Sequence, residues 1–260
     1  MRSAPIRVQL EQKLRDRYRT SFRFSQRPQP ETALTGIEAV DQLSRGLPRG
    51  HITEIFGRDS SGRTTLLLSA LAQITEKEEV CGLIDPAGTF DPTSAATIGV
   101  DLERLLWIRT GRDIDQTLKA TDLLLQGGGF GLIGVDLGEF PLATVRRIPF
   151  SSWFRLQRAV EDTPTILLFL NRDSSLKTCA SLVLRLQLDC TDWSPHLFRG
   201  IRPRVEIIRS KTDPTASWNN ASQRFWIPPA NYFQAVANRP VHTPFIKEAS
   251  SIEGVSCHES

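Results

Sequence analysis

The stretch GRDSSGRTT at residues 57–65 has the glycine spacing of a phosphate-binding P-loop. Such a loop surrounds phosphate oxygens with backbone N–H groups, and the helix that follows it adds the positive end of its dipole. The pattern requires lysine where this chain has Arg63. A guanidinium is longer, planar and forked, so the exchange is not conservative. The loop therefore predicts phosphate binding, whereas hydrolysis needs groups that the loop alone does not supply.

Contacts to a bound nucleotide are expected from the loop and from the next buried strand. Thr64 carries the hydroxyl that such loops place on Mg²⁺, and Asp136 ends an apolar strand, where a carboxylate orients water on the metal. The phosphate contacts are expected from Gly57, Ser60, Ser61, Gly62, Arg63, Thr64 and Thr65. The alternative is a loop that only connects a strand to a helix.

A second glycine pattern, GxGxxG, is formed by Gly129, Gly131 and Gly134. A dinucleotide fingerprint follows a strand and opens a helix, whereas these glycines enter the strand that ends at Asp136. We interpret them as a tight turn from a helix into a strand.

Apolar runs alternate with helical patterns through the middle of the chain. We expect strands at 51–57, 80–85, 105–110, 131–137 and 165–171, with one helix directly after the P-loop and another that begins at Asp113. This order predicts an α/β fold of P-loop NTPase type, with a mostly parallel sheet flanked by helices. Three further runs, 182–188, 203–210 and 222–227, have no helical pattern between them and predict an antiparallel C-terminal extension.

Charge is unevenly placed along the 260 residues. The formal net charge is +3, yet residues 1–34 hold eight Lys or Arg and three acids. We expect residues 1–34 to be a basic amphipathic arm and linker, 35–228 the nucleotide-binding core and 229–260 a flexible tail. The arm could contact nucleic acid or an acidic partner, or could be a solvated helix face.

The remaining composition favours a soluble, cytoplasmic protein. The apolar runs are too short to span a bilayer, and the N-terminus lacks the apolar stretch of a signal peptide. The four cysteines have neither zinc spacing nor a disulfide framework, and three of them lie in or beside apolar runs, which is typical of buried thiols.

Longer segments carry a family resemblance. GLPRGHITEIFGRDSSGRTTLLL, LIDPAGTFDP, IGVDLERLL, GLIGVDL, TILLFLN and PRVEIIRSK follow one another in the order and spacing of the RecA recombinase family, which this chain resembles over roughly residues 35–215. The resemblance implies an ATPase core of RecA type that holds ATP between neighbouring subunits and works on single-stranded DNA.

Position by position, the resemblance is partial. It implies that Asp91 hydrogen-bonds adenine and that Arg209 and Lys211 reach a neighbour's ATP. The position of the family's catalytic glutamate is Ala87, which can accept no proton, so no catalytic residue is assigned. Ser94 replaces the aromatic residue that stacks on the base, and Arg172 replaces the glutamine that senses the γ-phosphate.

The segments that match the family's DNA-binding loops are short in this chain. DNA phosphates could still be bound by Arg146, Arg147, Arg155, Arg158 and Lys177. Trp153 or Phe154 could stack on a base, or both could pack beneath the shortened loop.

With its replaced catalytic residues and shortened loops, the chain is similar to ImuA-type proteins. These are RecA-like members of bacterial mutagenesis cassettes that assist translesion synthesis with a polymerase-like partner. Three hypotheses follow. The first is an ATP-binding, DNA-associated accessory protein of DNA repair, recombination or the damage response, with weak or no hydrolysis. The second is an active DNA-dependent ATPase and recombinase in which Asp85 or Glu139 acts as the base. The third is a nucleotide-free interaction scaffold; self-association is open in each.

Overall fold

A computed structural model describes residues 30–176, 178–212 and 222–229, which form one layered α/β body. Its main sheet has eight strands in the order β10-β9-β8-β3-β7-β6-β4-β5. The parallel strands are β3 (His51–Phe56), β4 (Val80–Ile84), β5 (Leu105–Ile108), β6 (Phe130–Asp136) and β7 (Ile166–Asn171), which are joined at one edge by β8 (Leu182–Ser194), β9 (Leu197–Ser210) and β10 (Ser222–Arg224). A separate small sheet pairs β1 (Thr32–Ala33) with β2 (Leu47–Pro48).

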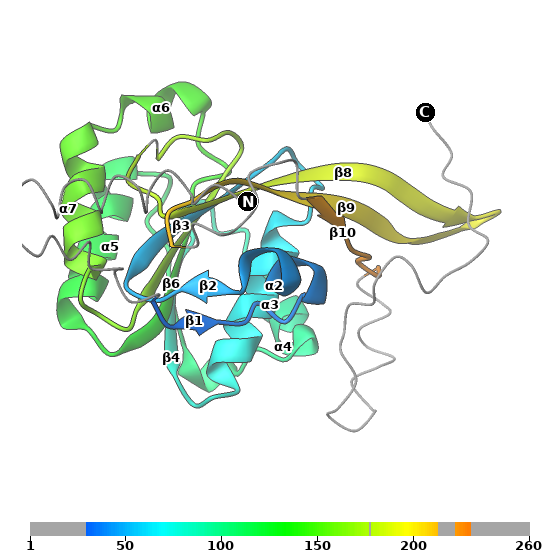
Figure 1. Cartoon of the computed structure of the whole chain (residues 1–260), viewed down its shortest axis with the longest axis horizontal. Coiled ribbons are helices and arrows are strands. Elements are labelled where there is room, and N and C mark those ends of the chain that lie inside the picture. Colours follow the sequence, from blue (N-terminus) through cyan, green and yellow to red (C-terminus); the bar gives the residue numbers. More distant parts are fainter. Residues whose placement is uncertain (1–29, 177, 213–221, 230–260) are drawn as a thin grey trace, which may run out of the picture.

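Helices cover both faces of the parallel strands (Figure 1). The first face carries α2 (Glu38–Ser44), α3 (Arg63–Thr75) and α4 (Pro92–Ile98), and the 3₁₀ turn η1 (Leu102–Arg104) follows α4. The second face carries α5 (Ile114–Gly127), α6 (Leu142–Arg147) and α7 (Phe150–Val160). Each crossover between parallel strands lays a helix over the sheet, which is why the central strands are apolar on both faces.

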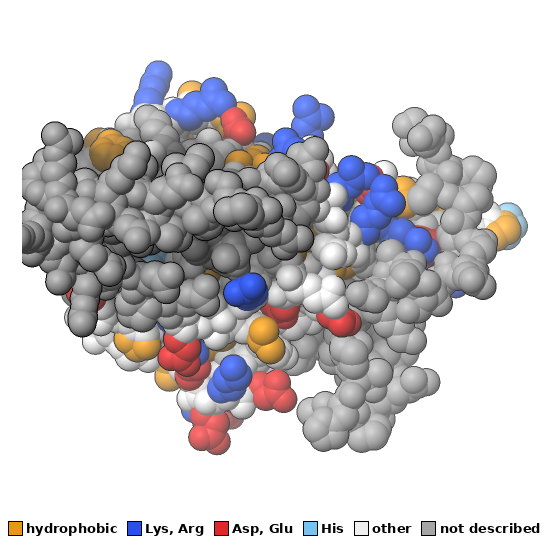
Figure 2. Space-filling view, in the orientation of Figure 1, with side chains coloured by type: hydrophobic (Ala, Val, Ile, Leu, Met, Phe, Trp, Pro, Cys, Tyr) orange, Lys and Arg blue, Asp and Glu red, His pale blue; other side chains and the backbone are white. Residues whose placement is uncertain are grey.

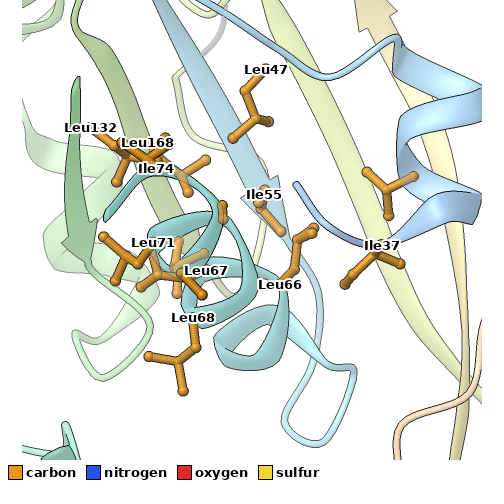
Figure 3. Packing of buried hydrophobic residues seen from close by; sticks show 14 of the residues in the cluster. Ile37, Leu47, Ile55, Leu66, Leu67, Leu68, Leu71, Ile74, Leu132 and Leu168 are labelled. Atoms are coloured by element: carbon orange, nitrogen blue, oxygen red, sulfur yellow. The ribbon is translucent and has the colours of Figure 1, made fainter. Parts of the chain in front are cut away.

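The α3 side of the core is the larger of the two clusters. Leu66, Leu67, Leu71 and Ile74 are almost completely buried and pack onto the sheet, as Figure 3 shows. All positions from Leu66 to Ala72 of α3 are buried, which fits a helix that is covered on several sides. This packing fixes the N-terminus of α3, and with it the P-loop, against the end of β3.

Strands β8 and β9 leave the body as a long antiparallel ribbon (Figure 1). β8 is parallel to β3 only from Leu182 to Arg185, whereas its pairing with β9 continues to Ser194. The predicted antiparallel extension is therefore confirmed, but both strands are much longer than the apolar runs that marked them. Beyond the body the ribbon is held by ladder hydrogen bonds and cross-strand pairs such as Trp193 with Phe198, which an apolar run does not reveal.

The predicted central elements are confirmed to within a few residues at their ends. Asp113 caps α5 by accepting hydrogen bonds from the N–H groups of Asp115 and Gln116, as its position predicted. The turn before β6 has positive φ angles at Gly128 and Gly129, in agreement with its interpretation as a tight turn.

Several expectations fall at the edges of the described residues. β1 begins ahead of the expected core boundary at residue 35, whereas residues 1–29 and 230–260, which hold most of the expected arm and tail, lie outside the described part of the chain.

Cys81 and Cys179 are buried free thiols, and burial raises the pKa of Cys81 to about 12. Within the described ranges, no helix has the length and apolarity needed to cross a bilayer.

Candidate nucleotide-binding site

Polar residues gather where three neighbouring parallel strands end. β3 leads into the P-loop at Gly57, the adjacent strand β7 ends at Asn171, and the next strand β6 ends at Asp136. Because parallel strands all end at the same edge of a sheet, these residues lie side by side in the region where open α/β sheets bind ligands. The sequence-predicted loop and acid are thus brought together, with Asn171 between them.

The P-loop is packed so closely that two of its positions accept only glycine. A methyl group on Gly57 would lie 2.2 Å from the carbonyl oxygen of Leu186 in β8. Gly62 has a φ of 89°, and a methyl group there would lie 2.8 Å from Cδ1 of Ile227. Ser60 also has a positive φ. The left-handed conformations turn successive N–H groups toward one side, which makes a concave site for an anion.

Two further features of the loop favour a bound anion. The first N–H groups of α3, at Arg63, Thr64 and Thr65, belong to the turn that has no intrahelical acceptors. The hydroxyl oxygen of Ser61 is buried and has no hydrogen-bond partner within the part of the chain that the structure describes. A buried hydroxyl without a partner costs about 1–3 kcal/mol, and a phosphate oxygen is a suitable acceptor for it.

Arg63 extends sideways across the ends of the strands. Its Nη1 donates a hydrogen bond of 2.5 Å to the backbone carbonyl of Asn171, and its Nη2 lies 3.3 Å from a carboxylate oxygen of Asp59. The side chain is only 12% exposed. Burial lowers the pKa of Arg63, while the nearby Asp136 and Asp59 act in the opposite direction. The guanidinium is therefore anchored within the site by neighbours on both sides.

Asp136 faces the same small volume as Arg63. A methyl group built onto Gly138 would lie 3.0 Å from Oδ1 of Asp136 and 3.1 Å from Nη1 of Arg63. Oδ1 of Asp136 accepts a hydrogen bond of 2.8 Å from the N–H of Gly138. Burial raises the pKa of Asp136, against the effects of that hydrogen bond and of Arg63. Thr64, the other expected metal ligand, is exposed at the start of α3.

The two acids considered as alternative bases, Asp85 and Glu139, have other partners. Asp85 accepts hydrogen bonds from the N–H groups of Gly88, Thr89 and Phe90, and so shapes the turn that contains Ala87. Glu139 lies 3.5 Å from Nη2 of Arg172. Neither carboxyl group is left without a partner to act as a base in this arrangement.

Asp91 is used as a helix cap. Its carboxylate accepts hydrogen bonds from the N–H groups of Thr93 and Ser94 at the start of α4, and the Ser94 hydroxyl is the main cause of its lowered pKa. The side chain is exposed to solvent, so this cap leaves it accessible to a ligand.

Arg209 and Lys211 do not reach the P-loop of their own chain. Arg209 pairs with Val183, and Val183 pairs with Glu54, three residues before Gly57 on β3. At about 3.3 Å per residue, Arg209 is roughly 10 Å short of the loop along the strand. Lys211 lies further back and donates a hydrogen bond to the carbonyl of Thr178. Any contact with ATP would have to come from a neighbouring copy.

A buried glutamate that the sequence reasoning missed organises the end of β7. Glu54 is completely buried in β3, and its Oε1 accepts hydrogen bonds from the Asn171 amide and from the N–H groups of Ser175 and Leu176. Its Oε2 accepts from the Ser174 hydroxyl. The signal in the sequence was an acid at the centre of the apolar strand HITEIF, which needs partners when it is buried.

The expected DNA-binding arginines that are described lie on α6 and α7. Arg146, Arg147, Arg155 and Arg158 are all exposed, and Figure 2 shows Lys and Arg side chains gathered over α6. Arg146 is paired with Asp173 at 2.6 Å and Arg155 with Asp122 at 3.7 Å. Lys177 lies outside the described residues.

The aromatic residues of α7 divide between the two interpretations made from the sequence. Trp153 is buried with its ring edge-on to Phe169, so it is a packing residue. Phe154 is 42% exposed, stacks with the exposed Phe150 and lies beneath the guanidinium of Arg158 at 4.9 Å. An exposed aromatic pair beside arginines is a suitable platform for a nucleic acid base.

Comparison with known proteins agrees with this fold. Residues 25–140 match the family model described as the RecA N-terminal domain. The chain is 34% identical over 217 residues to Protein RecA of Chelativorans sp., which covers 71% of this chain and 60% of that protein, and 28% identical over 214 residues to Protein RecA of Wigglesworthia glossinidia brevipalpis, which covers 70% and 64%. A shorter stretch of 108 residues is 43% identical to Protein RecA of Sinorhizobium medicae. The matches span less than two thirds of the length of these relatives.

Proposed function

We propose that this chain, a distant homologue of RecA with a RecA N-terminal domain region, is an ATP-binding, DNA-associated protein of DNA repair or recombination that hydrolyses ATP weakly or not at all. One observation carries the proposal. A tightly packed P-loop lies at the same edge of the sheet as two acids, Asp85 and Glu139, that already have other partners. Phosphate binding is supported by the loop, whereas activation of water is not.

Nucleotide binding in this proposal uses the loop as follows. The N–H groups at the start of α3 and the Ser61 hydroxyl donate to phosphate oxygens, and the guanidinium of Arg63 turns toward the terminal phosphates. Thr64 and Asp136 are the residues that would hold Mg²⁺, which when bound screens the charge of the phosphate oxygens. Asp91 is exposed and is available to hydrogen-bond the adenine base of the nucleotide.

Slow hydrolysis is expected because, among the described residues, the candidate bases Asp85 and Glu139 have other partners. In-line attack on the γ-phosphate needs a group that orients water and accepts its proton. Ala87 cannot accept a proton, Asp85 holds its own turn, and Glu139 is paired with Arg172. We therefore favour an accessory role, such as support of a translesion polymerase in the manner of ImuA-type proteins, over an active recombinase.

Titration with a fluorescent ATP analogue tests nucleotide binding. We expect saturable binding that weakens at least about tenfold in Arg63→Ala, because the charge-assisted contacts to phosphate are lost. Ser151→Ala, an exposed residue on the opposite face of the sheet, is the control and should bind like the natural chain. Absence of saturable binding in the natural chain would reject the proposal in favour of a nucleotide-free scaffold.

Salt-dependent binding of single-stranded DNA tests the surface of α6 and α7. Log K falls with log salt, and removing one phosphate contact makes this slope less steep by about 0.7, so Arg147→Ala combined with Arg158→Ala should make it less steep by about 1.4. Arg104→Ala, on the turn η1, is the matched control with an unchanged slope. An unchanged slope in the double variant would show that DNA, if bound, lies elsewhere.

A further inference from the structure

Two arginines at the mouth of the P-loop share one carboxylate. Oδ1 of Asp59 lies 3.3 Å from Nη2 of Arg63, and Oδ2 of Asp59 lies 3.4 Å from Nη2 of Arg172. Asp59 belongs to the P-loop itself, whereas Arg172 directly follows β7. The two guanidinium groups thus approach the loop from different elements and meet at a single anion.

Asp59 is held there weakly. Its side chain is 68% exposed, and both contacts are longer than a normal charge-assisted hydrogen bond of about 2.7–2.9 Å. Because solvent screens this exposed carboxylate, each ion pair contributes only about 0–1 kcal/mol. A phosphate group carries more negative charge and more acceptor oxygens than this carboxylate, so it can displace Asp59 from both arginines.

Each arginine has a second contact besides Asp59. Arg63 donates from Nη1 to the Asn171 carbonyl, and Nη2 of Arg172 lies 3.5 Å from Oε1 of Glu139. The Asn171 bond keeps the guanidinium of Arg63 in place when Asp59 leaves, and Nη2 of Arg172, which contacts Asp59 as well as Glu139, becomes available to a phosphate oxygen. Together the two groups carry the formal charge of one magnesium ion.

We propose that Arg63 and Arg172 form a two-arginine clamp for the terminal phosphates of a nucleotide, that Asp59 occupies the clamp when the site is empty, and that the clamp makes nucleotide affinity largely independent of Mg²⁺. The proposal rests on the nucleotide binding proposed above. It assigns a role to Arg172 and Asp59, and it explains the exchange at Arg63: a forked guanidinium can contact a carbonyl and a phosphate at the same time, which a single ammonium does less well.

The test compares fluorescent ATP and ADP analogues in buffer with Mg²⁺ and in buffer with EDTA. In the natural chain we expect the dissociation constants in the two buffers to agree within about threefold. Arg63→Lys combined with Arg172→Gln removes the clamp but keeps one cation, and its affinity should fall about tenfold or more when Mg²⁺ is removed. Asp59→Asn removes the competing carboxylate and should tighten binding about threefold in both buffers.

The outcomes separate the clamp from the nucleotide site. A tenfold or greater loss in EDTA for the natural chain would overturn the clamp while leaving nucleotide binding intact. Failure to bind in either buffer would overturn both. Thermal unfolding of each variant checks that it is folded. If the double variant does not fold, the natural chain and Asp59→Asn still test the clamp. Weaker or unchanged binding in Asp59→Asn also contradicts it.

Discussion

Glu54→Ala is expected to lower the free energy of unfolding by about 3 kcal/mol or more, because it leaves buried donors without acceptors. The donors are the Asn171 amide, the N–H groups of Ser175 and Leu176 and the Ser174 hydroxyl, all of which bond to the Glu54 carboxyl group. No water-exposed position is available to this side chain in the middle of β3. Urea denaturation followed by circular dichroism measures the change.

Two further variants sharpen this prediction. Glu54→Gln keeps one acceptor oxygen and the side-chain volume, so we expect a loss between those of Glu54→Ala and the natural chain. Glu161→Ala removes an exposed glutamate at the C-cap of α7 that accepts a hydrogen bond from the Gln157 side chain, and it should change stability by less than about 0.5 kcal/mol. A loss below about 1 kcal/mol for Glu54→Ala would mean that the segment after β7 does not depend on this residue.

Gly57→Ala is expected to abolish nucleotide binding and to destabilise the fold by about 3 kcal/mol, in the range of overpacked cores. The added methyl group would meet the carbonyl oxygen of Leu186 at 2.2 Å and the Ser61 hydroxyl at 2.7 Å. A backbone carbonyl cannot rotate away as a flexible side chain can, so the P-loop or β8 must move. Fluorescent-nucleotide titration and urea denaturation measure the two effects.

Gly127→Ala is the matched control for that substitution. A methyl group on Gly127 meets no atom within 4 Å, and the residue ends a helix with a negative φ. Alanine should therefore leave nucleotide binding unchanged and stabilise the protein by up to about 1 kcal/mol. If Gly57→Ala behaved like Gly127→Ala, the loop would not have the packed conformation described above.

Local patterns predicted the parallel sheet well, because the signals are contained within each segment. The apolar run that ends at Asp136 predicted β6, and Asp113, a residue type that caps helices, predicted the start of α5. The ribbon was underestimated because β8 and β9 alternate apolar and charged residues outside the body. Their length depends on pairing with each other, which neither segment shows alone.

The sequence suggested residues for the candidate site but could not show the contacts that these residues make. The loop, Thr64 and Asp136 follow from spacing, whereas the partner of Arg63 is a backbone carbonyl 108 residues away, which no side-chain pattern reports. The hydrogen bonds that Asp85 accepts from its own turn are equally hidden, because the sequence does not distinguish an occupied acid at a strand end from a free one. Only the geometry shows that this acid is occupied.

ATP turnover with and without single-stranded DNA tests the central claim, that the site binds nucleotide but lacks a base for hydrolysis. Purified protein with Mg²⁺ and ATP should release phosphate no faster than Arg63→Ala, in the absence and in the presence of DNA. A DNA-stimulated rate in the natural chain that Arg63→Ala lacks would contradict the claim, because it would require a base that the arrangement around Ala87 does not supply.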